Sequence, residues 1–357
     1  MANLVLDRVV VEGAARRRLD EVSIDVDDGD FIGVIGGSGS GKTTLLRAVA
    51  GLDRVTSGHV RIGGSDMTRD EPRDRDVGMV FQAPALIGHL SARRNVSFPL
   101  EVRRHDADEI RNRVDAEARA LHIERLLERE PSTLSHGEQQ LVQIARALVR
   151  APRLLLLDEP FASLDEHLRS RMRAEIALLQ AGYGVTTLMA TNDPADVMSL
   201  TTSLVVLDEG RVVQHGATSL VRESPATLTA AAATGSLSLI DMTVVADGTG
   251  YWLVREDPRG GEPVRIRVWS PAYRAHVGSV VTVAFRPEQL VVSPTGAIPA
   301  IVERRLPISR GGVRCSVAGA SLMVTAEHAG GLTQGDAVRL RIDHLVAFDK
   351  LTDTAIA

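Results

Sequence analysis

The sequence of 357 residues has one cysteine, few aromatic side chains and almost no lysine. Cys315 has no partner for a disulfide within the chain, and 44 % apolar with 24 % charged residues excludes general disorder. Six Phe, three Tyr and two Trp are too few for a base-stacking surface, and a net charge of −5 offers no general attraction to phosphate backbones. We therefore expect no nucleic-acid partner.

Segments that insert into a membrane or direct secretion are also missing. No apolar stretch approaches the roughly 20 residues that span a bilayer, and the first residues do not show a basic region followed by an apolar one. These observations predict a cytoplasmic chain. At about 150 residues per domain, its length predicts two domains.

Short apolar segments alternate with helical periodicity over residues 1–235. Phe31–Ile35 precedes a helical stretch that stops at Gly51, and Leu154–Leu157 is followed by another over Glu166–Gln180. Alternation of this kind predicts an α/β domain built around a buried, partly parallel sheet.

A helical insertion is expected within this domain at about residues 90–150, because the strand pattern stops near Leu90. Asp106–Glu130 carries apolar residues at helical spacing, which predicts one helix over that range.

The pattern changes after an alanine- and serine-rich stretch, Ala230–Ser238, which predicts a linker or a short helix. Residues 236–357 are expected to form a small all-β domain, an OB-like barrel or a sandwich. The strands expected there are Val264–Trp269, Val280–Phe285, Val313–Val317 and Ala337–Ile342.

A glycine cluster follows the apolar segment Phe31–Ile35 and contains Lys42, one of only two lysines among 41 basic residues. Glycines here allow backbone N–H groups to turn inward around an anion, and the start of a helix adds positive partial charge. Lys42 is expected to reach the β- and γ-phosphates of a nucleotide, and Thr43 to bind Mg²⁺. The predicted nucleotide-binding residues are Gly36, Gly37, Ser38, Gly39, Ser40, Gly41, Lys42, Thr43 and Thr44.

Two carboxylates, Asp158 and Glu159, follow four consecutive leucines. Ligands of open α/β sheets bind at the carboxyl ends of strands, so Asp158 is expected to hold the metal through water. Glu159 is expected to orient or deprotonate an attacking water. Taken alone, this segment also fits a buried strand followed by a solvated turn.

The segment Leu134–Glu138 precedes a helical pattern. Ser135 is a natural N-cap and Gly137 allows close approach of another group, so this helix end could face an anion. Alone, the segment fits an ordinary capped helix better.

In this order the motifs resemble those of the ATP-binding subunits of ABC transporters, most closely the binding-protein-dependent sugar importers of the maltose type. Beyond the segments above, the resemblance rests on Gln82 after the expected strand Val77–Phe81 and on Ser163, Leu164 and Asp165. A looser resemblance covers residues 236–357, through Phe285–Leu290, to the regulatory β-domain of the same subfamily.

The resemblance implies a role for each matching residue. Catalytic roles are implied for Glu159, Gln82 and Asn192, and metal binding for Thr43, Gln82 and Asp158. Ser135, Gly137 and Asp165 are implied to contact the nucleotide together with the glycine cluster.

The resemblance further implies an ATP-hydrolysing subunit that uses ATP and Mg²⁺ to power import of a solute, from the subfamily a carbohydrate. Two ATP-binding subunits would close head to tail, as a homodimer or a heterodimer. Two transmembrane permease subunits would dock near Gln82 and Ala83–Leu90, and a substrate-binding protein would act outside the cell. The chain is then expected at the cytoplasmic face of the membrane.

Three positions depart from the family pattern. Asn192 stands where the family has a switch histidine, which predicts slow hydrolysis because Asn cannot become cationic or exchange a proton. No aromatic residue precedes Asp30, although one is expected near Glu12 or Gly13 to stack on adenine. Glu138 places a charge where the family has a neutral amide, which should disfavour closure unless it faces away.

These departures leave alternatives open. The chain could be a catalytically weak nucleotide-binding partner in a heterodimeric assembly, or a soluble ABC-type ATPase not tied to transport. The single ATP-binding domain and short helical insertion disfavour the second. A further hypothesis is that the β-domain binds a regulator or metabolite.

Overall fold

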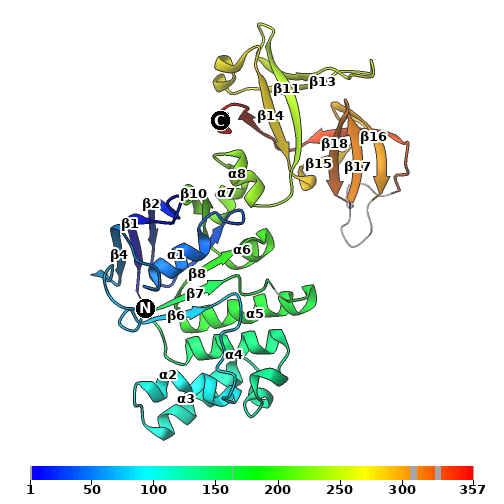
Figure 1. The fold of residues 1–357 in the computed structure, drawn as a ribbon. Helices are drawn as coiled ribbons and strands as arrows, with labels where there is room; N and C mark the ends of the chain where they lie inside the picture. The colour runs from blue at the N-terminus through cyan, green and yellow to red at the C-terminus, as the bar shows by residue number, and fades with distance from the viewer. Residues whose placement is uncertain (1, 163, 306–311, 326–330, 357) are drawn as a thin grey trace. The chain divides into compact units, whose positions relative to one another are not determined.

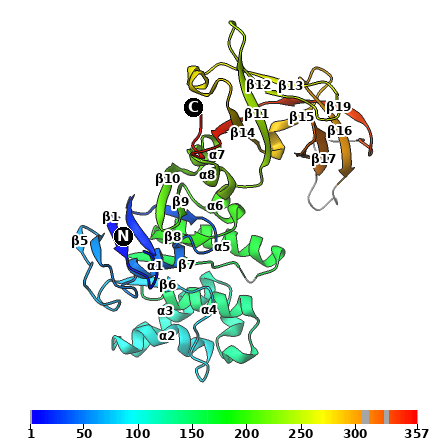
Figure 2. The same cartoon turned by 45° about the horizontal axis from the view of Figure 1, so that its top comes forward.

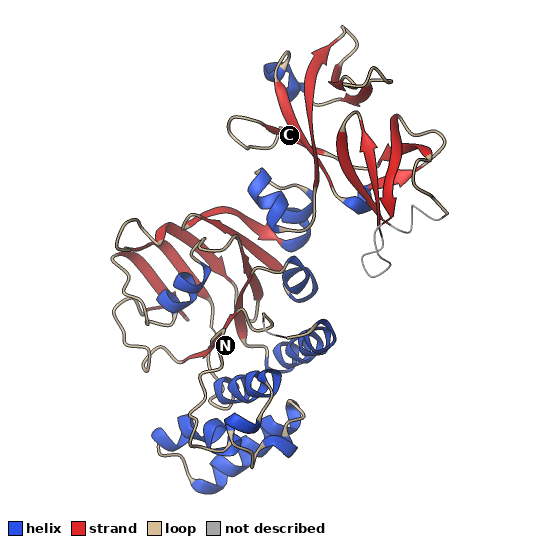
Figure 3. Cartoon of the chain, turned by 45° about the vertical axis from the view of Figure 1, so that its right-hand side comes forward, coloured by secondary structure: helices blue, strands red, loops and turns tan. Residues whose placement is uncertain are grey.

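The computed structural model describes residues 2–162, 164–305, 312–325 and 331–356. Contacts divide the chain into two compact units, Met1–Val221 and Arg222–Ala357 (Figure 1). Residues 222–235, which the sequence pattern places in the first domain, group with the second unit. Figure 3 shows that the first unit mixes helices and strands, whereas the second consists mainly of strands.

The first unit is built on a six-stranded sheet of order β10-β9-β3-β8-β7-β6. All neighbours are parallel except β10, which pairs antiparallel with β9 at one edge. Every residue of β3, β7 and β8 is buried, as expected for a parallel sheet covered on both faces. The predicted α/β class is confirmed. The strands are β3 (Phe31–Ile35), β6 (Val77–Val80), β7 (Leu154–Asp158), β8 (Thr186–Thr191), β9 (Ser203–Asp208) and β10 (Arg211–Ala217).

A second sheet of the first unit is antiparallel and has the order β2-β1-β4-β5. One core cluster contains residues of this sheet, of the six-stranded sheet and of helix α1 (Lys42–Val49). The four strands are β1 (Leu4–Val11), β2 (Leu19–Val26), β4 (Ser57–Ile62) and β5 (Ser65–Asp66).

The helical insertion begins with α2 (Ala92–Val102) and ends with α4 (His136–Leu148). Both helices contact α3 (Ala107–Ala120), which lies between them in the sequence, and each other (Figure 2). The predicted helix over Asp106–Glu130 is wrong beyond residue 120. Asp106 is the N-cap of α3 (Ala107–Ala120), but His122 adopts a left-handed φ of 55°.

The physical reason is burial of the residues that follow α3. Leu121, Ile123, Leu126 and Leu127 are all buried, and a single helix face cannot contain all four. The chain turns inward instead, through the short 3₁₀ segments Glu124–Leu126 and Pro131–Thr133.

The remaining helices of the first unit follow strands β7 and β8. Helix α5 (Glu166–Tyr183) buries Met172 and Ile176 and ends at Gly184, whose left-handed φ of 61° suits glycine. Helix α6 (Pro194–Leu200) contacts both α5 and β3.

The second unit contains two five-stranded antiparallel sheets of order β13-β12-β11-β14-β20 and β15-β19-β16-β17-β18. One apolar cluster includes residues of both sheets. The predicted all-β character is confirmed. The strands are β11 (Ser238–Ala246), β12 (Tyr251–Arg255), β13 (Val264–Val268), β14 (Val280–Phe285), β15 (Leu290–Val292), β16 (Ile298–Arg305), β17 (Gly312–Val317), β18 (Ala320–Thr325), β19 (Ala337–Ile342) and β20 (Val346–Asp349).

Two short helices, α7 (Thr218–Glu223) and α8 (Leu228–Ala233), precede β11. The sequence predicts a linker or a short helix in the alanine-rich stretch, and the short helix is present. Ala231 of α8 is buried in a small cluster with Ala284 and Phe348, so this stretch belongs to the core of the second unit.

Candidate active site

The loop between β3 and α1 forms the predicted glycine cluster. A side chain at Gly36 would place its Cβ 2.0 Å from the carbonyl oxygen of Leu207, so packing requires glycine there. A Cβ at Gly37 or at Gly39 would have nothing within 4 Å. The backbone is therefore open at these two positions, as close approach of a phosphate requires.

Lys42 is the first residue of α1, and its ammonium uses all three donors within the site. Its Nζ donates to the carbonyl oxygens of Gly36 and Gly37, both at 2.9 Å, and to Oδ1 of Asn192 at 2.6 Å. Burial lowers the pKa of Lys42, and the neighbouring Glu159 carboxylate opposes that shift.

Thr43 and Asp158 meet between α1 and the end of β7. The Thr43 hydroxyl donates to Oδ1 of Asp158 at 3.0 Å. Burial raises the pKa of Asp158, and the bond from Thr43 opposes it. A hydroxyl beside a carboxylate is an oxygen donor set that suits Mg²⁺. The buried hydroxyl of Ser40 has no hydrogen-bond partner in the described part of the chain.

Glu159 follows β7 in an unusual conformation. Its φ of 47° lies in the left-handed region, which costs about 1–3 kcal/mol for a residue other than glycine. Its N–H donates to the carbonyl oxygen of Ala190 at 2.8 Å. Burial raises the pKa of Glu159, and a hydrogen bond from the Asn192 backbone opposes the shift.

One pocket of about 360 Å³ brings most of the predicted residues together. It contains residues of the glycine loop, Gln82 after β6, Glu159 and Asn192. Its lining consists of Arg16, Arg17, Arg18, Ser38, Gly39, Gly41, Lys42, Thr43, Thr44, Gln82, Glu159, Asn192, Glu209 and Gly210.

Five of these residues were not predicted: Arg16, Arg17, Arg18, Glu209 and Gly210. The available signal was a run of three arginines directly before strand β2, which alternates apolar and polar residues. No aromatic residue is among the described residues that line this pocket.

Ser135, at the start of α4, does not line the pocket. It is the predicted N-cap, because its hydroxyl accepts from the Glu138 N–H at 3.3 Å. Oε2 of Glu138 accepts from the N–H of Ser135 at 2.9 Å and from its hydroxyl at 3.1 Å. These bonds lower the pKa of Glu138, so an anion lies directly against the Ser135 hydroxyl.

Gly137 and Asp165 also lie outside the pocket. A Cβ at Gly137 would be 2.5 Å from Cδ2 of Leu168, so the group that approaches this glycine closely is a leucine of α5. Asp165 is the N-cap of α5 and accepts from the Leu168 N–H at 2.9 Å. Ser163 lies outside the described residues.

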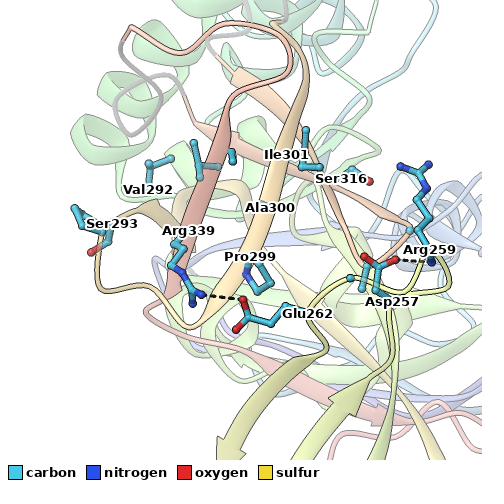
Figure 4. A pocket seen from close by; sticks show the side chains of 16 residues that line it. Asp257, Arg259, Glu262, Val292, Ser293, Pro299, Ala300, Ile301, Ser316 and Arg339 are labelled. Atoms are coloured by element: carbon cyan, nitrogen blue, oxygen red, sulfur yellow. Dashed lines mark hydrogen bonds and ion pairs between the residues drawn. The ribbon is translucent and has the colours of Figure 1, made fainter.

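The second unit has a separate pocket of about 710 Å³ (Figure 4). Apolar groups such as Pro299, Ile301 and Val338 line it. Glu262 and Arg339 form an ion pair at 2.9 Å, which Figure 4 shows beside Pro299.

Within the described ranges, none of the helices combines the length and apolar character needed to cross a membrane.

A strand, a glycine loop and a helix that begins with lysine, together with acidic residues at the end of another parallel strand, define a P-loop nucleoside triphosphatase. The sequence pattern of the family described as "ABC transporter" matches residues 19–162. Two curated relatives are named sn-glycerol-3-phosphate import ATP-binding protein UgpC. The protein of Ruegeria pomeroyi is 40 % identical over 75 % of this chain and 83 % of its own length. The protein of Salmonella typhi is 38 % identical over 85 % of this chain and 84 % of its own length.

Similar solved structures agree with this family assignment. CbiO1 of Clostridium perfringens, part of an ABC transporter complex, has a TM-score of 0.56 at 29 % identity and covers 60 % of this chain and 88 % of its own. The ATP-binding cassette MJ0796, solved as a dimer with ADP and Pi, has a TM-score of 0.55 at 29 % identity. The match covers 60 % of this chain and 98 % of that one. The chain belongs to the ATP-binding subunits of ABC transporters, which are ATPases.

Proposed function

We propose that this chain hydrolyses MgATP to power import of a small polyol or carbohydrate solute through membrane permease subunits. The observation that carries the proposal is the single pocket that holds Lys42, Thr43 and Glu159, with Asp158 bonded to Thr43. The names of the relatives, which specify sn-glycerol 3-phosphate, support this solute class and suggest the first compound to test.

The residues where α1 begins and β7 ends fit a magnesium ion. The Thr43 hydroxyl and the Asp158 carboxylate would hold it, directly or through water, and Gln82 lines the same pocket. When bound, the ion would neutralise charge on the phosphates.

Lys42 must change partners when a nucleotide binds. All three of its donors are occupied, and two of them go to backbone carbonyls of its own loop. The bond to Asn192 is the one to a side chain, which can rotate away. We infer that a phosphate oxygen replaces the Asn192 amide oxygen, and that the freed Asn192 side chain then turns its N–H₂ group to the phosphate.

Glu159 is the base or water-orienting group. Its raised pKa makes it a better proton acceptor than an exposed carboxylate, and the Asn192 N–H fixes its direction. The backbone of Glu159 is in turn bonded to β8 through Ala190, so the carboxylate is positioned by two elements.

Ser135, Gly137 and Asp165 lie outside the pocket of their own chain, so we propose that they contact nucleotide bound by a second subunit. Ser135 begins α4, where the helix N-terminus favours an anion. The partner could be a copy of this chain or a related subunit. Bound to permeases, the assembly would lie at the cytoplasmic face of the membrane.

An uptake assay tests the transport function. A strain that lacks the gene is complemented with the wild type, Glu159→Gln or Arg8→Lys, and uptake of labelled sn-glycerol 3-phosphate and of maltose is measured. We expect uptake of one of these solutes with the wild type and with Arg8→Lys, whose side chain is exposed and outside the pocket. Equal uptake with Glu159→Gln would contradict the proposal.

The pocket of the second unit favours an additional role, binding of a small regulator with an apolar part. Ile301 lines this pocket and is 50 % exposed, so a ligand could cover it. Thermal denaturation of the full chain with a panel of metabolites tests this role. A compound that stabilises the wild type and Leu351→Arg, but not Ile301→Arg, would support it, and no stabilising compound would count against it.

A further inference from the structure

The nucleotide pocket contains more than a phosphate site. Its glycine loop fits phosphates, and Gln82, Glu159 and Asn192 surround the position of hydrolysis. The lining residues that remain are Arg16, Arg17, Arg18, Glu209 and Gly210. These remaining residues are the ones in the lining that are free to contact the base of a nucleotide.

The backbone of Arg18 lies against the glycine loop. A Cβ at Gly41 would be 2.8 Å from the carbonyl oxygen of Arg18. The side chain of Arg18 also occupies defined space, because a Cβ at Gly13 would be 3.0 Å from its Cγ. Its aliphatic stem thus lies where a side chain of residue 13 would begin.

The guanidinium groups in this part of the pocket are held by carboxylates. Arg18 pairs at 3.3 Å with Asp53, whose side chain is only 9 % exposed. Arg16 pairs at 3.3 Å with Glu209, another residue of the lining. Arg17 pairs with Glu12 and with Asp20. Arg18 is therefore the arginine with the best-buried anchor.

We infer that Arg18 supplies the plane on which the nucleotide base stacks, with Arg16 and Glu209 as the neighbouring wall. The inference rests on the proposed binding of MgATP. A guanidinium is planar, weakly hydrated and stacks on aromatic faces, whereas a lysine ammonium has no plane. The base-binding end of this pocket thus uses arginine where no aromatic side chain is available.

Base selectivity follows from this arrangement. Stacking tolerates different bases because each has a π-face. The Glu209 carboxylate can accept from the exocyclic amino group of adenine or from the N–H groups of guanine. ATP and GTP are therefore expected to bind with affinities within about fivefold of each other.

Binding measurements on the full chain separate the plane of Arg18 from its charge. Arg18→Lys keeps the charge and removes the plane, and Arg8→Lys is the matched control on β1. Calorimetric titrations use MgATP, MgGTP and magnesium tripolyphosphate. Arg18→Lys should weaken both nucleotides about tenfold or more and change tripolyphosphate by less than about twofold. Arg8→Lys should change none of the three.

Unchanged nucleotide binding by Arg18→Lys would overturn the inference, and so would an equal loss of affinity for tripolyphosphate. A preference of the wild type for ATP over GTP above about 30-fold would overturn it as well. If Arg18→Lys does not fold, Asp53→Asn releases the Arg18 guanidinium instead and should weaken the nucleotides alone. Because Asp53 also binds Arg47, Arg47→Gln is the control and should leave nucleotide binding unchanged. Lys42→Ala distinguishes the two proposals. If this variant binds the nucleotides as tightly as the wild type does, the proposed function itself is rejected.

Discussion

Glu159 combines a left-handed backbone, a half-buried carboxylate and a bond from the Asn192 N–H. We predict that Glu159→Gln lowers kcat roughly 10²- to 10⁴-fold, because the amide cannot accept a proton. The variant should also be more stable at neutral pH by about 1 kcal/mol, because it removes a half-buried carboxylate whose desolvation is only partly offset by the charge of Lys42. Phosphate release and thermal unfolding measure the two effects.

The stability difference depends on pH with a definite sign. Burial raises the pKa of Glu159 in the folded state above its unfolded value, so the folded chain binds the proton more readily. The advantage of Glu159→Gln should be largest above the raised pKa and decline as the pH falls through it. An advantage that grows on acidification would contradict this assignment.

Asn192 lies between Lys42 and Glu159, where a histidine could exchange a proton. We predict that Asn192→His raises kcat by up to about tenfold, because imidazole can become cationic beside a developing phosphate charge. Steady-state phosphate release measures the change, with Asn192→Gln as the control that retains an amide. No gain over the control would show that Asn192 does not limit turnover and would remove the main argument for slow hydrolysis.

The glycine loop was predictable because its residues are consecutive and their chemistry is local. The arginines at 16–18 and the turn at Glu209 were not, because their place depends on contacts between distant segments. The Gly210 N–H donates to the carbonyl oxygen of Ser40 at 2.9 Å, and the Asp20 N–H donates to that of Gly210 at 2.9 Å. These bonds bring both turns beside the glycine loop, and no local pattern encodes them.

Helix α4 begins with a capping box that places a carboxylate on Ser135. We predict that Glu138→Gln strengthens nucleotide-driven association, because the neutral amide can still bond to the Ser135 N–H but no longer repels a phosphate. The cost in folding stability should stay below about 1 kcal/mol. Analytical ultracentrifugation with MgATP measures association, and unchanged association would mean that Glu138 does not face the nucleotide.

Secondary-structure elements were predictable from the sequence where all of their residues are buried. Strands β3 and β7 read as nearly continuous apolar segments because both faces of the sheet are covered. The end of α3 was not predictable from periodicity, because Leu121 and Leu126 extend the apolar spacing of the helix. Only the structure shows that Ile123 and Leu127 are buried as well and that the chain turns at His122. Helix ends of this kind depend on what the next segment packs against.

Assembly is the property of the complete chain that the proposed mechanism requires. If ATP is bound between two subunits, a variant that binds but does not hydrolyse it should accumulate as a dimer. We predict that Glu159→Gln with MgATP elutes at about twice the monomer mass of 38.3 kDa, and as a monomer without nucleotide. Size-exclusion chromatography with light scattering measures the mass.

Ser135 and Thr227 provide a matched pair for the control, because both are N-caps whose loss costs about 1 kcal/mol of stability. Ser135→Ala in the Glu159→Gln background should abolish the dimer, since it removes a donor expected at the nucleotide of the other subunit. Thr227→Ala in the same background should not. Equal effects would show that the loss reflects general destabilisation. A monomer in every case, with MgATP bound, would instead favour a heterodimer, because this chain would then lack the surface that closes on its own copy.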